Sequence, residues 1–121
     1  MFYRHVTGMT YTEGVKNMAE ENNAYWLIDA ISSHIIFNPR FKARCAKDER
    51  YADMQIWILE TNENQARLFS VADTTQEELN QPTCLQKISY TDFPHPSIKF
   101  YCARNFINGK ETYTIMKPSE Y

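Results

Sequence analysis

The chain has 121 residues, of which 43% are hydrophobic and 23% are charged. This composition is typical of one soluble globular domain, residues 1–121, with its own core, and it argues against a disordered protein. The net charge of −2 gives no global attraction to nucleic acid, so RNA binding would need a local basic patch. Three cysteines without C-x-x-C spacing and no apolar run of about 20 residues predict free thiols, a cytoplasmic location and no membrane span.

The first part of the chain predicts three helices. Thr10 and Glu13 stand at capping-box spacing, which indicates a helix over 11–21. An Asn-Asn pair suits a helix end followed by a new cap, so a second helix is expected over 24–36. An Asn-Pro pair ends that helix and predicts a short third one over 39–48.

The remainder of the chain predicts strands. MQIWILE and ARLFSVA are rich in β-branched and aromatic residues and are separated by turn residues, which indicates a hairpin. Residues 84–90, 97–104 and 111–116 predict three further strands, the last two joined by an Asn108-Gly109 turn. Helices followed by strands predict an α+β fold, in which N-terminal helices pack on one face of an antiparallel sheet of about four to five strands.

Asp29 interrupts an otherwise apolar helix, AYWLIDAISSH. At about 100° per residue the aliphatic side chains face the sheet, whereas Asp29 lies in a polar row with Tyr25 and Ser33. We expect neighbouring aromatic side chains to shield this carboxylate from water, so that it needs a hydrogen-bond or cationic partner. We favour a structural carboxylate bonded to an arginine or to backbone amides; the alternative is a residue of a binding pocket.

Two further segments carry polar groups that such a pocket would need. FYRH brings Arg4 and His5 beside aromatic rings, a set able to bind phosphate or carboxylate. We favour instead an N-terminal strand whose Arg4 pairs with an acid such as Asp29 or Asp92. In YTDFPHP, Asp92 and His95 lie on a proline-fixed loop, which indicates either a functional loop or an Asx turn.

NPRFKARCAKDER holds the only concentration of positive charge in the chain. On a helix, Arg40, Arg44 and Lys47 form one stripe, a local footprint for phosphate, while Phe41 faces the core. The alternative is a solvated amphipathic face, which we favour because acidic residues follow at once.

The sequence contains no catalytic or metal-binding motif, and its three glycines do not form a nucleotide-binding loop. We therefore assign no catalytic residue, no cofactor and no metal, and we favour a non-enzymatic protein over an enzyme. Cys45 lies next to basic residues that would lower a thiol pKa, but we expect a structural role for it, as for Cys84 and Cys102. His34, at a helix end, is expected to be a packed histidine rather than a ligand or base.

Several motifs occur in a characteristic order: Tyr3-Arg4-His5, YTEGV at 11–15, AYWLIDAI at 24–31, a strand with Trp57, YTDFP at 90–94 and PSEY at 118–121. In these the chain resembles an uncharacterised bacterial family of unknown function, whose members are small single-domain proteins of plasmids, phages and other mobile elements. The resemblance supplies no activity, substrate or catalytic residue. It implies an accessory protein in a setting where small proteins block host machinery by binding it, which is an association and no mechanism.

Three hypotheses follow. The first is a non-enzymatic binding protein that inhibits a host defence complex, such as a CRISPR ribonucleoprotein, by contacting its protein or guide RNA through the basic stripe. The second is a small-ligand-binding protein or enzyme in which Arg4, His5, Asp29 and Asp92 converge between the second helix and the sheet. The third is a homodimer joined through a sheet edge.

Overall fold

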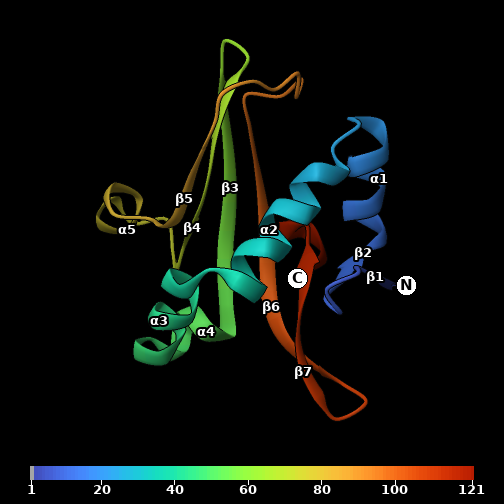
Figure 1. Cartoon of the computed structure of the whole chain (residues 1–121), viewed down its shortest axis with the longest axis vertical. Helices are drawn as coiled ribbons and strands as arrows, with labels where there is room; N and C mark the ends of the chain where they lie inside the picture. The colour runs from blue at the N-terminus through green and yellow to red at the C-terminus, as the bar shows by residue number, and fades with distance from the viewer. Residues whose placement is uncertain (1) are drawn as a thin grey trace.

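The computed structural model describes residues 2–121, which form a seven-stranded sheet ordered β1-β2-β7-β6-β3-β4-β5, with α2 lying across one face (Figure 1). In chain order the elements are β1 (Phe2–Arg4), β2 (Thr10–Thr12), α1 (Glu13–Glu21), α2 (Tyr25–Phe37), α3 (Pro39–Lys47), α4 (Glu49–Asp53), β3 (Met54–Asn62), β4 (Gln65–Val71), α5 (Gln76–Asn80), β5 (Thr83–Ile88), β6 (Ser97–Ile107), β7 (Lys110–Met116) and the 3-10 helix η1 (Pro118–Glu120). The α+β class is confirmed.

The sheet has more strands than predicted, because the segment before the first helix contributes β1 and β2. β2 runs parallel to β7, with Thr10 opposite Thr114, so the sheet is mixed rather than purely antiparallel. Since Thr10 is held in this ladder, it does not cap the helix. Thr12 does so instead, and its hydroxyl accepts a hydrogen bond from the Val15 N–H (3.4 Å).

The second and third predicted helices are confirmed as α2 and α3. Asn38 caps α3 by accepting a hydrogen bond from the Arg40 N–H (2.9 Å), and Pro39 occupies the first turn. The short helices α4 and α5 were not predicted, because their sequences are strongly polar. Asp48 starts α4 by accepting from the Tyr51 N–H, so the charged stretch at 48–50 begins a new helix.

The main core lies between the helices and one face of the sheet. α2 contributes four aliphatic residues to it, Leu27, Ile28, Ile31 and Ile35, in the predicted positions. The sheet contributes Trp57 and Leu59, both fully buried. Burying side chains of this size stabilises the fold by about 1.5–3 kcal/mol each. No helix within residues 2–121 is long and apolar enough to cross a membrane.

Both predicted hairpins are present. Glu63 and Asn64 connect β3 to β4 with φ of 51° and 67°, and Asn108 and Gly109 connect β6 to β7 with φ of 53° and 78°. Two successive residues with positive φ match the right-handed twist of the paired strands. The prolines at 94 and 96 lie in the loop before β6, as expected.

Candidate functional site

Helix α3 carries the basic residues that the sequence singled out, and its orientation is fixed by one buried ring. Phe41 is 3% exposed and packs against Tyr51 (ring centroids 5.6 Å apart) and Trp57 (6.5 Å). With Phe41 turned inward, Arg40 and Lys47 lie on the outer face and are exposed. They are two helical turns apart, a separation of about 10 Å.

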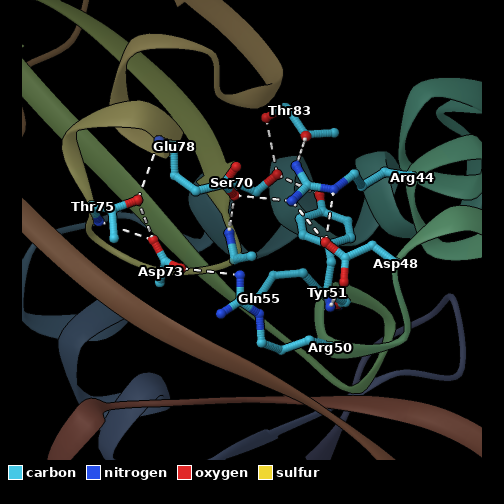
Figure 2. Close-up of polar contacts among 11 residues, drawn as sticks. Arg44, Asp48, Arg50, Tyr51, Gln55, Ser70, Asp73, Thr75, Glu78 and Thr83 are labelled. Atoms are coloured by element: carbon cyan, nitrogen blue, oxygen red, sulfur yellow. Dashed lines mark hydrogen bonds and ion pairs between the residues drawn. The ribbon is translucent and has the colours of Figure 1, made fainter.

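Arg44, predicted as the middle residue of the stripe, is directed elsewhere (Figure 2). Its guanidinium donates to Asp48 Oδ2 through Nε (3.2 Å) and a terminal nitrogen (2.9 Å), and to Glu78 Oε1 (3.0 Å). The other terminal nitrogen donates to Thr83 Oγ1 (3.1 Å), and the group lies over the Tyr51 ring (4.7 Å to its centroid). The guanidinium of Arg44 is therefore bonded to groups of the same molecule. The predicted stripe of three cations facing a partner is wrong at Arg44.

The Arg44 cluster joins five elements of the fold. Beneath the guanidinium, the Tyr51 hydroxyl bonds to Ser70 Oγ (2.7 Å), and Ser70 donates to the Thr83 carbonyl (2.9 Å). Burial raises the pKa of Tyr51 well above its usual value. Arg50 pairs with Asp73 (3.0 Å) at the other side of the cluster, as Figure 2 shows. These contacts hold α3 and α4 against β4, β5 and the segment that contains α5.

Arg40 and Lys47, here called the α3 patch, remain free. Neither takes part in an ion pair or side-chain hydrogen bond within residues 2–121. Lys42 is also exposed but lies on the opposite flank of the helix. Phe37, which ends α2 three residues before Arg40, is 71% exposed. The exposed ring of Phe37 thus ends the helix that directly precedes α3 in the chain.

Asp29 is bound to His5 rather than to an arginine. His5 Nε2 lies 2.6 Å from Asp29 Oδ1, and the two side chains are 12% and 67% exposed. The expectation that aromatic neighbours shield Asp29 is wrong, because Tyr25 turns away and donates its hydroxyl to Glu20 (3.1 Å). The pair fastens the β1–β2 connection to α2, and the partner of Asp29 is a histidine, not the arginine or backbone amides favoured from the sequence.

The four residues of the predicted pocket do not converge. Arg4 lines a cavity near the end of α2, whereas His5 and Asp29 pair beside it and are not among the lining residues. Asp92 lies in the loop before β6 and makes no side-chain hydrogen bond or ion pair within residues 2–121; its neighbour Thr91 donates its N–H to Asn64 at the β3–β4 turn.

The histidines and thiols have structural surroundings. His34 stacks on Trp57 (5.7 Å) and bonds to Gln86 (2.7 Å), as expected for a packed histidine. The three cysteines are free, and burial raises the pKa of each, most strongly for Cys102. For Cys45 this corrects the expectation of a lowered pKa, because desolvation outweighs the nearby arginines. No group of three or more metal-ligating side chains is found in the part of the chain that the structure describes.

Comparison with known proteins identifies a family. A family model whose description reads "Family of unknown function (DUF6876)" matches residues 1–121. Neither a curated protein nor a solved structure matches the chain. The match agrees with the resemblance to an uncharacterised family and carries no activity or site residue with it.

Proposed function

The chain belongs to the DUF6876 family of unknown function, and from this premise we propose that it is a non-enzymatic protein that binds RNA through the α3 patch. The observation that carries the proposal is the contrast within one helix. Arg44 is fully engaged by acids, whereas Arg40 and Lys47 meet no acid within residues 2–121. Two exposed cations on the same face of a helix suit the phosphate groups of a nucleic acid, because charge attraction to phosphate does not require a strict contact geometry.

The composition of the patch favours RNA over an acidic protein surface. Protein interfaces are depleted in lysine at their cores, whereas lysine and arginine serve equally as contacts to a phosphate backbone. Phe37 adds an exposed ring on which an unpaired base can stack, as aromatic side chains do in single-strand recognition. The net charge of −2 gives no general attraction to RNA, so binding needs a local group of cations such as this patch.

The partner that we propose is the RNA of a host defence ribonucleoprotein, such as a CRISPR effector. The support is the mobile-element setting that the family resemblance implies, together with a free patch that suits a phosphate backbone. Three free thiols favour the reducing cytoplasm, where such complexes work. Occupying guide RNA would block the complex without any reaction, and of the four residues of the predicted pocket only Arg4 lines the cavity near the end of α2.

The test is affinity purification of the tagged protein from a host that carries its defence systems. The wild type is expected to capture a complex that contains RNA, and the Arg40→Glu/Lys47→Glu variant is expected to lose it. A matched control, Lys87→Glu/Lys99→Glu, makes the same change of charge at exposed positions on β5 and β6 and should keep the complex.

Two results would remove the proposal. The first is equal capture by the α3 variant, provided that circular dichroism shows both variants folded. The second is a captured complex that survives ribonuclease treatment and contains no RNA, which would indicate a protein partner instead. The homodimer hypothesis is tested in the same preparation by light scattering, since β5 is a free edge of the sheet.

A further inference from the structure

A cavity of about 600 Å³ lies between the end of α2, the β1–β2 connection and the β6–β7 hairpin. Figure 1 shows the end of α2 in front of β6, with β7 and then the β1–β2 connection to the right. The volume of this cavity falls within the range of about 300–1,000 Å³ that small-molecule sites occupy. None of the residues of the α3 patch lines it, so it is a separate feature of the molecule.

Two cations from distant parts of the sequence reach this cavity. Arg4 comes from β1 and Lys110 from the start of β7, and both are exposed. Neither forms an ion pair in the part of the chain that the structure describes. The one acid in the lining, Glu111, lies 3.8 Å from Arg104, which takes up part of its charge. The cavity therefore has an excess of positive charge.

The inner wall of the cavity is apolar. Met9 and Ile35, exposed by 1% and 4%, contribute to it, and Tyr113 turns its hydroxyl away to donate to the Ala52 carbonyl (2.7 Å). An apolar wall next to cations suits a ligand with a charged head and a hydrophobic body.

The walls are held in place before any ligand arrives. His5 bonds to Asp29 on α2, and its other ring nitrogen lies 2.9 Å from Thr7 Oγ1. The β1–β2 connection turns at Gly8, whose φ of 92° is one that glycine adopts without strain. Thr112 of β7 donates to the Gly8 carbonyl (3.3 Å), which ties the connection to the hairpin. A site fixed in this way loses little conformational entropy on binding.

We propose that this cavity binds a small monocarboxylate with a compact apolar body. The planar guanidinium of Arg4 matches the two oxygens of a carboxylate, and Lys110 adds a second point charge. Glu111 disfavours a dianion, because a second negative charge would meet its carboxylate. The apolar wall formed by Met9, Ile35 and Tyr113 takes the body of the ligand.

The experiment is an NMR titration with phenylacetate, following the amide signals of Gly8 and Thr112, which both line the cavity. We expect saturable shifts with phenylacetate. Phenylacetamide, which has the same body without the charge, and inorganic phosphate should each bind at least about tenfold more weakly. Arg4→Gln and Lys110→Gln should each weaken phenylacetate binding by a similar factor.

The control is Lys99→Gln, which removes an exposed lysine outside the cavity and should leave the affinity unchanged. Equal binding of phenylacetate and phenylacetamide would overturn the proposal, and so would full affinity in both cavity variants. Hexanoate is titrated as a second monocarboxylate with an apolar body. If neither phenylacetate nor hexanoate gave saturable shifts, the proposal would also be overturned. RNA binding by the α3 patch is independent of these outcomes, since the Arg40→Glu/Lys47→Glu variant keeps the cavity intact.

Discussion

Replacing Arg44 by methionine tests the assignment of this residue to the scaffold. The substitution removes the guanidinium but keeps an unbranched apolar stem of similar length, so packing over Tyr51 is largely retained. The side chains of Arg44, Asp48 and Glu78 are 24%, 28% and 18% exposed, which makes these pairs stronger than pairs on an open surface. Two carboxylates and the Thr83 hydroxyl lose their shared donor.

The expected cost follows from these contacts. Each ion pair contributes about 0.5–1 kcal/mol at this degree of exposure, after screening by water. The hydrogen bond to Thr83 contributes about 1 kcal/mol, while the methionine stem keeps most of the packing on Tyr51. The free energy of unfolding should therefore fall by about 2–3 kcal/mol, which corresponds to a decrease in Tm of about 10 °C for a domain of this size.

The assay is urea denaturation followed by tryptophan fluorescence, because Trp57 is fully buried and reports on the core. Arg40→Met is the matched control: it makes the same substitution one turn earlier on α3 at an exposed position and should change the unfolding free energy by less than about 0.5 kcal/mol. If both variants were equally stable, Arg44 would not anchor α3, and the reasoning would be refuted.

Three further predictions concern acid stability, thiol reactivity and the β1–β2 connection. Hydrogen bonds from Arg44 hold the pKa of Asp48 below its ordinary value of about 3.9. The ionised Asp48 therefore stabilises the fold above that pH, and this stabilisation is lost as the pH falls below it. The loss of unfolding free energy below about pH 4 should be smaller in Arg44→Met than in the wild type. Cys102 is completely buried and should react with a thiol reagent only after unfolding, so rapid labelling of the native protein would contradict its position. Asp29→Asn should lower the unfolding free energy by less than about 1 kcal/mol, because the Asp29 carboxylate is 67% exposed, while amide exchange at residues 7–9 increases. An unchanged exchange rate would show that the pair does not fasten this connection.

The elements that sequence reasoning placed correctly are those with strong local signals. α2 has a regular aliphatic stripe, α3 begins with an Asn-Pro pair, and both hairpins have turn residues that tolerate positive φ. These signals act within a few residues of each other, so they can be read without knowledge of the fold.

The sequence-based predictions are wrong where a side chain's partner lies in a distant segment of the chain. Thr10 looks like a helix cap, but its partner in the sheet, Thr114, lies 104 residues away. Arg44 looks like part of a basic stripe, but its guanidinium donates a hydrogen bond to Glu78, 34 residues later. Lys110 carries no local signal, and its presence at the same cavity as Arg4 follows only from the arrangement of the strands.

The central claim is that the cations of α3 have two different roles. The α3 patch binds RNA, whereas Arg44 stabilises the fold. The salt dependence of binding to a single-stranded RNA 12-mer tests it most directly, since each phosphate contact adds about −0.7 to the slope of log K against log salt concentration. The wild type and Arg44→Met should both give a slope near about −1.4, and Arg40→Glu/Lys47→Glu a slope near zero. A reduced slope in Arg44→Met, or an unchanged slope in the double variant, would contradict the claim.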